Sequence, residues 1–300
     1  HTYPVRDKTP GEPMGIQIAS VRTGAISVSL EFPPADAEVV PGVAWGAVEA
    51  FPTPAYWAYQ VLARRVENQV VRYRLGSTLR EEIGACLLGG HGIPARVGIE
   101  AFHHLRAMGA FGPDVPTEES LVAWLSQPLT IDGRKVRYRF AAQKAKYLSG
   151  TLERLCEKDL CGMAGLQLRN HLVELPGIGY KTASWVARNW LDADDVAILD
   201  IHILRAGVIA KFLDPDLTVE RDYLELEQQF LRFSAGLGVR SSELDAVMWL
   251  EMMSAPRSVS AVLRALPESR VKDKHAPKHA PSGLRANNRN SNTSQLALIA

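Results

Sequence analysis

The sequence predicts a mainly α-helical protein that begins with a small β-hairpin. Three observations predict this: alternating apolar residues near the N-terminus, a long series of helix-like apolar patterns from residue 53 onward, and a polar, basic C-terminal end. The 300 residues are 46% hydrophobic, which is enough for a buried core. We expect an N-terminal extended segment with a β-hairpin (1–52), a helical body (53–263) and a disordered basic tail (264–300).

The first segment shows the two-residue period of a β-hairpin. Ile16 and Ile18 precede a turn signal at Thr23-Gly24, and beyond it four apolar residues share one face: Ile26, Val28, Leu30 and Phe32. The stretch 33–54 is rich in Pro and Gly and predicts an irregular connection.

The helical body starts at a predicted N-cap. Thr53 can cap a helix that has Pro54 at its first position and runs toward Val70. Further helical patterns follow, separated by Gly or Pro: 78–88, 94–108, 117–126, 140–158, 164–173, 181–191, 200–212, 219–235 and 241–253.

Composition excludes several classes of protein. No apolar run approaches the roughly 20 residues that a membrane span needs, and no secretory signal is recognisable. We therefore expect a soluble intracellular protein of the cytoplasm or nucleoid. Cys86, Cys156 and Cys161 are too few for a disulfide framework or for the four ligands of an iron–sulfur cluster, so no such cluster is expected.

The formal net charge of +1 is unevenly distributed. From residue 264 onward there are seven basic and two acidic residues, a charge of +5, which leaves 1 − 5 = −4 on residues 1–263. Any affinity of the helical body for nucleic acid must therefore come from local groups.

The most informative segment lies between two helical patterns, at 175–180. Gly177 and Gly179 permit backbone conformations that a Cβ would forbid. The N–H groups at the start of the next helix would then form an anion site for a DNA phosphate, which makes Gly177, Ile178 and Gly179 candidate DNA-binding residues. The structural alternative is an ordinary tight turn between two helices.

This segment resembles the helix-hairpin-helix superfamily of DNA glycosylases, and within it the compact archaeal and bacterial 8-oxoguanine DNA glycosylase/AP lyases. The resemblance covers roughly residues 55–255 and implies two helical lobes with the active-site cleft between them. Lys181 stands where bifunctional members keep their nucleophile. A partly buried amine at a helix N-terminus has its charged form disfavoured, which supplies the neutral amine that Schiff-base chemistry needs. A solvated or phosphate-contacting lysine is the alternative.

Asp200 is the candidate catalytic carboxylate. It lies 200 − 181 = 19 residues after Lys181 in an apolar stretch, where an acid is costly unless it is paired or used. The stretch resembles the Val-Asp-x-His motif of the 8-oxoguanine glycosylases, which places His202 at the phosphate-contacting histidine. The alternatives are an N-cap for the next helix at Asp200 and ordinary packing at His202.

A late helix resembles the one that recognises the base in this family. Asp245 matches the polar, purine-recognising position, and Trp249 matches the aromatic residue that stacks on the expelled base. Their i, i+4 spacing puts both on one helical face. Trp185 has the same spacing from Lys181 and could form the other wall of the base pocket. Core packing of both tryptophans and a surface position for Asp245 are the alternatives.

Upstream, the segment 86–96 resembles the loop that fills the gap left by the extruded base. His91 matches the gap-filling position, although the family commonly has Asn there, and Arg96 matches the arginine that reads the orphaned partner base. A loop histidine and a surface arginine are the alternatives. The departure at His91 leaves the preferred partner base open.

The resemblance implies a repair enzyme for double-stranded DNA that carries a damaged base, acting as a monomer without a redox cofactor or catalytic metal. It also implies a structural K⁺ or Na⁺ on the backbone carbonyls of Val173, Leu175 and Ile178. An endonuclease III-like enzyme for oxidised pyrimidines, an enzyme for another modified base, and an inactive DNA-binding module are the competing interpretations.

Overall fold

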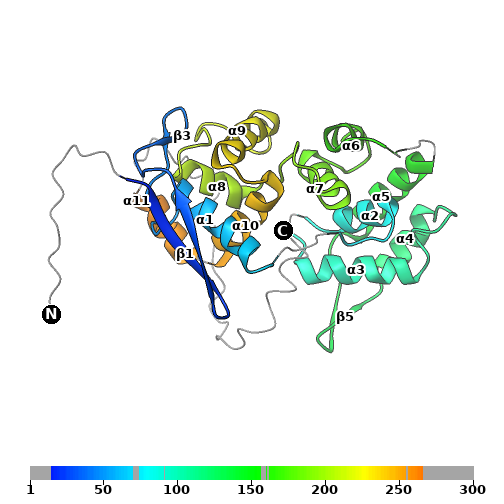
Figure 1. The fold of residues 1–300 in the computed structure, drawn as a ribbon. Coiled ribbons are helices and arrows are strands. Elements are labelled where there is room, and N and C mark those ends of the chain that lie inside the picture. The colour runs from blue at the N-terminus through cyan, green and yellow to red at the C-terminus, as the bar shows by residue number, and fades with distance from the viewer. Residues whose placement is uncertain are drawn as a thin grey trace. The chain divides into compact units, whose positions relative to one another are not determined.

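The computed structural model describes residues 15–69, 74–90, 92–156, 160, 162–254 and 256–265. They form a mainly helical protein with small antiparallel hairpins, and it divides into two compact units (Figure 1). The first unit takes in the described parts of 1–70, 202–217 and 228–272, and the second those of 71–201 and 218–227. Among the described helices, none has the length and apolarity that a membrane span needs. The predicted helical class and the N-terminal hairpin are confirmed.

The strands of the first unit pair as β1 (Gln17–Thr23) with β2 (Ile26–Phe32), and β3 (Glu38–Val40) with β4 (Val43–Ala44). Gly24 adopts a φ of +58° in the turn between β1 and β2, a conformation that favours glycine. Val21 and Phe32 are buried on the inner face of this hairpin. The described part of the N-terminal segment, residues 15–52, thus packs as part of the first unit.

The first unit also contains α1 (Pro54–Val66), α8 (Ile201–Ile209, from its second residue), the later part of α9 (Tyr223–Leu237), α10 (Ser241–Ser254) and α11 (Pro256–Ala265). Thr53 caps α1 as predicted, because its Oγ1 accepts a hydrogen bond of 3.1 Å from the Tyr56 amide. The core of the unit includes the buried residues Trp57, Phe233 and Met248.

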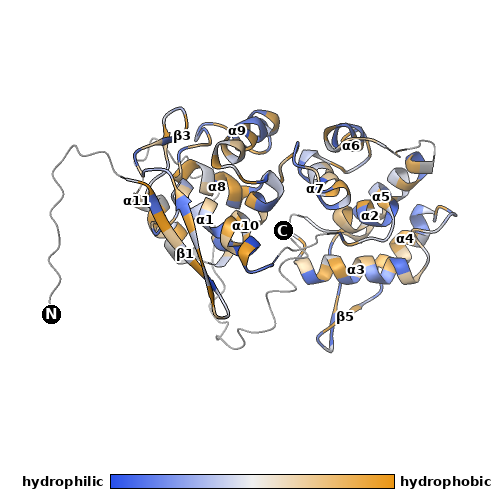
Figure 2. Ribbon diagram, in the orientation of Figure 1, coloured by the Kyte–Doolittle hydropathy of each residue, from blue (hydrophilic) through white to orange (hydrophobic). Residues whose placement is uncertain are grey.

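The second unit contains α2 (Leu79–Leu88), α3 (Ala95–Ala107), α4 (Glu118–Leu125), β5 (Leu129–Ile131), β6 (Arg134–Val136), α5 (Ala141–Cys156), α6 (Gly165–Leu172), α7 (Tyr180–Leu191) and the first turns of α9. Figure 2 shows hydrophobic and hydrophilic residues alternating around these helices, as expected where each helix buries one face. The buried faces meet in a core that includes Phe102, Leu121, Leu148 and Val186.

Three elements were not predicted from the sequence. The β3–β4 hairpin lies in the stretch expected to be irregular, and the β5–β6 hairpin connects α4 to α5. Helix α11 includes residues 264–265, the first two of the segment expected to be a disordered tail, and residues 266–300 lie outside the described residues. The β5–β6 hairpin turns at Asp132-Gly133, a dipeptide typical of tight hairpins. Helix α9 begins at Tyr223 rather than at 219, because Asp222 accepts a hydrogen bond of 2.9 Å from the Thr218 amide in a turn before the helix.

Candidate active site

The hairpin at 175–180 is held by its own sequence and by α5. Gly177 has a φ of +73°, and a Cβ there would lie 2.3 Å from the Tyr147 side chain, so both conformation and packing require glycine. The Pro176 carbonyl accepts a hydrogen bond of 3.2 Å from Thr151 Oγ1. The Ile178 side chain is buried and anchors the turn in the core, so only its backbone is available to a ligand.

Gly179 leaves open space at the N-terminus of α7. Its φ of −91° is accessible to any residue, and no described atom lies within 4 Å of the position that a Cβ would occupy. Among the described residues, no side chain caps α7 at this end. The first-turn amides of α7 therefore have no side-chain acceptor there, which suits an external anion.

The two predicted catalytic residues lie together. Lys181 is in the first turn of α7, and Asp200 immediately precedes α8. Lys181 Nζ lies 3.7 Å from Asp200 Oδ2, and the two side chains are 43% and 13% exposed. The amine can thus be reached from solvent, while most of the carboxylate is enclosed. The pair belongs entirely to the second unit.

A buried tyrosine fixes the backbone that leads to Asp200. The Tyr223 hydroxyl, on α9, donates a hydrogen bond of 2.7 Å to the Ala197 carbonyl and accepts one of 3.1 Å from the Leu199 amide. On its other side, the Tyr223 ring stacks on Tyr180, with centroids 5.5 Å apart. Tyr223 therefore contacts both the segment before Asp200 and the residue before Lys181.

A buried ion pair supports the same segment. Arg169 Nη2 on α6 lies 3.0 Å from Glu227 Oε2 on α9, and each side chain is 4% exposed. Glu227 Oε1 accepts hydrogen bonds from the Ala197 amide at 3.0 Å and from Ser184 Oγ at 3.4 Å. Burial raises the pKa of Glu227, while the Ala197 amide and Arg169 act in the opposite direction. Burial also raises the pKa of Tyr223.

This supporting network of Arg169, Glu227 and Tyr223 was not predicted from the sequence. Arg169 and Glu227 occupy inward positions of helices whose neighbouring core residues are apolar, and a buried charge without a purpose is costly. Their position on the apolar faces of their helices could therefore have indicated that both charges are buried and paired. That they pair with each other could not be predicted, because 227 − 169 = 58 residues separate them.

Trp185 lies against the loop that follows α2. Its side chain is 9% exposed, and a Cβ on Gly89 would lie 3.3 Å from the indole. Within the described residues, the indole Nε1 is buried without a hydrogen-bond acceptor. Trp185 thus has one turn of helix between it and Lys181, and it retains an unsatisfied donor. Its predicted role as a pocket wall stays a prediction.

Two side chains cap the C-terminal end of α2. One lies just before α5, and the other lies within α5. Lys144 Nζ donates to the carbonyls of Leu87 at 2.6 Å and Gly89 at 3.2 Å, and Tyr138 donates to Leu88 at 2.7 Å. These bonds satisfy carbonyls that a helix end leaves unpaired. Burial lowers the pKa of Lys144 and raises that of Tyr138.

The two residues predicted to act at the gap in the duplex have different outcomes. His91 lies outside the described residues. Arg96 is exposed at the start of α3, and its guanidinium pairs with both carboxylate oxygens of Asp132 in the β5–β6 turn, with Nη2 2.6 Å from Oδ1. Arg96 therefore has a protein partner in the absence of DNA, and its contact with a base stays a prediction.

The remaining predicted residues belong to the first unit. Asp245 on α10 is 2% exposed, and it is not a surface acid. Trp249, one turn later, is partly buried and meets His202 edge-to-face, with ring centroids 6.5 Å apart. His202 thus packs beside the tryptophan predicted to stack on the base. The joint action of this group with Lys181 stays a prediction.

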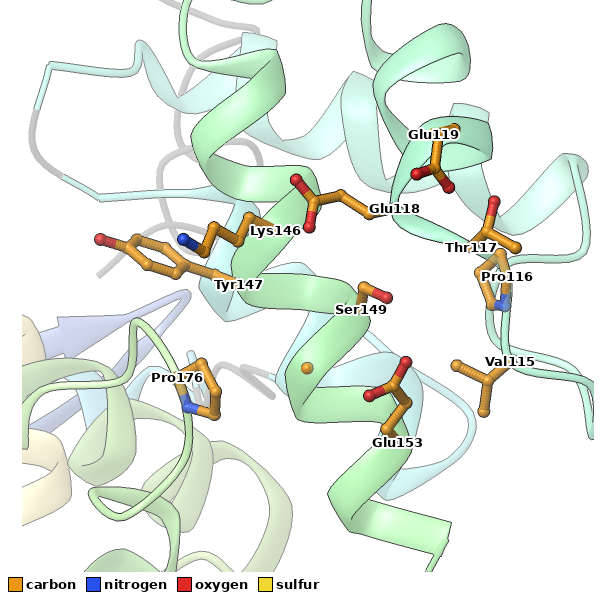
Figure 3. Close-up of a pocket in the computed structure, with 11 residues that line it drawn as sticks. Val115, Pro116, Thr117, Glu118, Glu119, Lys146, Tyr147, Ser149, Glu153 and Pro176 are labelled. Carbon is orange, nitrogen blue, oxygen red and sulfur yellow. The ribbon is translucent and has the colours of Figure 1, made fainter.

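An open pocket of about 540 Å³ in the second unit contains none of the predicted catalytic or base-binding residues (Figure 3). It lies between α4 and α5, beside Pro176 of the hairpin. Three carboxylates line it, from Glu118, Glu119 and Glu153, together with one lysine, Lys146. This acidic lining disfavours a polyanion such as DNA.

The described residues contain no group of three or more His, Cys, Asp or Glu side chains placed to hold a metal ion. Cys86 is buried, and burial raises the pKa of its thiol. The side chain of Cys156 and the whole of Cys161 lie outside the described residues.

Comparison with known proteins places this geometry in a family. The family model for 8-oxoguanine DNA glycosylase matches residues 77–239. A curated 8-oxoguanine DNA glycosylase/AP lyase of Methanocaldococcus jannaschii is 40% identical over 77 residues, 25% of this chain and 37% of the relative. A protein of the same name from Thermoplasma acidophilum is 39% identical over 84 residues, 28% of this chain and 40% of the relative. The matches thus span about two fifths of these relatives.

The fold has a solved counterpart. The crystal structure of the M. jannaschii 8-oxoguanine DNA glycosylase matches with a TM-score of 0.51 at 24% identity, and the match covers 67% of this chain and 94% of that one. This likeness supports the helix-hairpin-helix glycosylase fold. Since the family model spans more than half of the residues and includes Lys181 and Asp200, the chain belongs to the 8-oxoguanine DNA glycosylase family.

Proposed function

We propose that this protein is a bifunctional DNA glycosylase that excises 8-oxoguanine from double-stranded DNA and nicks the strand at the resulting site. The observation that carries the proposal is the pairing of Lys181 Nζ with Asp200 Oδ2 at 3.7 Å, directly after a glycine hairpin. Family membership agrees with it. The curated relatives bear the name 8-oxoguanine DNA glycosylase/AP lyase.

Lys181 is the nucleophile in this mechanism. A protonated amine has no lone pair for attack, so the lysine must give up a proton before it bonds to the sugar. Asp200 is close enough to accept the departing proton and, as an anion, to stabilise positive charge that develops on the deoxyribose. The 43% exposure of the lysine side chain leaves it accessible to a nucleotide rotated out of the duplex.

The reaction balances without an oxidant or reductant. The amine forms a bond to C1′ while the bond from C1′ to the damaged base breaks, and the base leaves with a proton. Opening of the sugar ring gives a Schiff base between Lys181 and C1′. Loss of a proton from C2′ then expels the 3′ phosphate by β-elimination, and hydrolysis of the imine regenerates the lysine.

DNA binding uses backbone groups of the hairpin. The phosphate would lie against the first-turn amides of α7, in the space that Gly179 leaves open. A monovalent cation on the carbonyls of Val173, Leu175 and Ile178 would add positive charge there. Leu175 suits this arrangement, since its carbonyl accepts one bond of 3.2 Å from the Ile178 amide and keeps a second lone pair.

Base recognition would use side chains that each unit carries. In the first unit, Trp249 would stack on the expelled base and Asp245 would accept hydrogen bonds from the N–H edge of that base. In the second unit, the indole of Trp185 has a donor that lacks a described acceptor. 8-Oxoguanine has an N7–H donor where guanine has an acceptor. A carboxylate acceptor therefore discriminates between them, because it can accept from the N7–H of 8-oxoguanine, whereas guanine N7 offers no donor.

Borohydride trapping tests the proposal. A duplex that contains 8-oxoguanine opposite cytosine should give a covalent band with the full chain, and Lys181→Gln should give none. Asp200→Asn should bind DNA but excise about 100- to 1,000-fold more slowly, as expected when a well-placed electrostatic group is removed. An equal band from Lys181→Gln would overturn the nucleophile. Faster excision of thymine glycol than of 8-oxoguanine would favour the endonuclease III-like alternative.

A further inference from the structure

Exposed basic residues gather on the β5–β6 hairpin of the second unit. Arg134, Lys135 and Arg137 are all exposed. Across the hairpin Leu129 pairs with Val136, and Thr130 pairs with Lys135. Leu129 is buried. Because successive strand residues point to opposite faces, Lys135 and Arg137 lie on the outer face.

The hairpin as a whole has a positive net charge, although its turn contains an acidic residue. Asp132 and Gly133 form the turn with φ values of +51° and +74°, and Asp132 is the one acidic residue in 127–137. Three basic residues against this acid give the hairpin a formal charge of 3 − 1 = +2. Asp132 pairs with Arg96 of α3, which raises the charge of the cluster to +3. Figure 1 shows the hairpin projecting past α3.

The hairpin leads directly to the loop after α2. The residue that follows Arg137 is Tyr138, whose hydroxyl donates to Leu88 at 2.7 Å. Phe140 lies against Gly92, since a Cβ there would be 3.4 Å from the phenyl ring. Gly89, at the other end of the loop, lies against Trp185 on the helix that carries Lys181. The basic hairpin is therefore built onto the loop that borders the candidate active site.

We infer that the β5–β6 hairpin is a separate contact for the DNA backbone, made by Arg134, Lys135 and Arg137. The inference rests on the proposed function, because it takes duplex DNA as the polyanion. Arginine and lysine side chains bind phosphates without reading sequence, and each contact releases counterions. Within the same unit the pocket of Figure 3 is lined by carboxylates, so the hairpin is the favourable side for a polyanion.

The salt dependence of binding to an undamaged duplex tests this directly. The triple variant Arg134→Gln, Lys135→Gln, Arg137→Gln should bind more weakly, with a shallower plot of log Kd against log salt. The slope should fall by about 0.9 for each phosphate that the variant no longer neutralises. At 0.15 M salt this corresponds to about 5-fold in Kd for one phosphate and about 170-fold for three. The single-turnover excision rate at saturating enzyme should stay at the wild-type value.

Three controls isolate the hairpin. Arg134→Lys with Arg137→Lys keeps the charge and should keep the slope. Arg106→Gln removes an exposed arginine at the other end of α3, roughly 15 Å along the helix from Arg96, and should change the slope less than Arg137→Gln. Asp132→Asn removes the negative charge from the cluster, and asparagine tolerates the positive φ at this position. This variant should bind DNA up to about 5-fold more tightly.

An unchanged slope in the triple variant would overturn the inference, as would an equal change in Arg106→Gln or weaker binding by Asp132→Asn. Because the duplex is undamaged, the result does not depend on excision. If the triple variant has the expected shallower slope than the wild type, but the wild type gives no covalent band in the borohydride trap, the proposed function fails and the hairpin contact stands. If the trap succeeds and the slope is unchanged, the proposed function stands and the hairpin contact fails.

Discussion

The hydroxyl of Tyr223 donates a hydrogen bond of 2.7 Å to the carbonyl of Ala197, three residues before Asp200. The same hydroxyl accepts from the Leu199 amide at 3.1 Å, and the ring stacks on Tyr180, the neighbour of Lys181. One buried side chain thus links the backbone segments that carry the nucleophile and the carboxylate. We therefore expect the relative position of Lys181 and Asp200 to depend on this link.

Tyr223→Phe should slow the excision step while DNA binding persists. The variant keeps the ring but leaves the Ala197 carbonyl and the Leu199 amide without their partner, which costs about 1–3 kcal/mol for each buried group. A small displacement of Asp200 should lower the single-turnover rate by about 10- to 100-fold. The measurement is the excision rate at saturating enzyme as a function of pH, since a displaced carboxylate also shifts the pH at which the rate is half-maximal.

Tyr138→Phe is the matched control. Tyr138 is equally buried, lies in the same unit and also donates to a backbone carbonyl, that of Leu88, at 2.7 Å. It should reduce the free energy of unfolding and leave the pH profile of excision unchanged. Equal rate losses in the two variants would show that Tyr223 contributes only to stability.

Glu227→Gln should destabilise the second unit strongly. The substitution leaves the Arg169 guanidinium buried without its counter-charge, and breaking a buried ion pair costs about 3–5 kcal/mol. Glu243→Gln removes the partner of Arg65 in a pair whose side chains are 24% and 36% exposed, and should cost at most about 1 kcal/mol. Urea unfolding of both variants measures the two losses of unfolding free energy. Losses of similar size would contradict the buried position of the Arg169–Glu227 pair.

Alkaline pH should reduce stability partly through Tyr56. Its hydroxyl donates to Glu251 at 3.1 Å, and burial, followed by the Glu251 charge, raises the pKa of Tyr56 from 10.0 to about 12. A raised folded-state pKa means that the contribution is complete below pH 10 and is lost as the pH rises through about 12. Tyr56→Phe should therefore lose less free energy of unfolding between pH 10 and pH 12 than the wild type. A parallel decline in the two proteins would exclude this contribution.

Substitutions on α10 should separate stacking from base recognition. Trp249→Ala should slow excision of every accepted base by about 5- to 150-fold, because stacking contributes about 1–3 kcal/mol and is insensitive to base identity. Asp245→Asn should change the preference among bases. The measurement is a duplex series with 8-oxoguanine, thymine glycol, uracil and an abasic site. An unchanged preference in Asp245→Asn would remove Asp245 from base recognition.

The site could be predicted from sequence where function depends on local order along the chain. Lys181 follows the Gly177–Gly179 hairpin within one turn, and Asp200 interrupts an apolar segment. Both signals lie within a few residues. The contacts that hold the segment before Asp200 could not be predicted in the same way. They involve Arg169 on α6 and Tyr223 and Glu227 on α9, which meet this segment only in the folded unit.

The sequence by itself determined the helices other than α11, the cap at Thr53 and the hairpin at 175–180, since apolar periodicity, capping and glycine conformation are local properties. It also determined the candidate nucleophile. Only the tertiary structure decided that Lys181 and Asp200 lie 3.7 Å apart, that Ile178 is an anchor, and that Arg96 binds Asp132. Those facts depend on packing between segments distant in sequence, where burial and charge pairing select one arrangement among many that the local patterns allow.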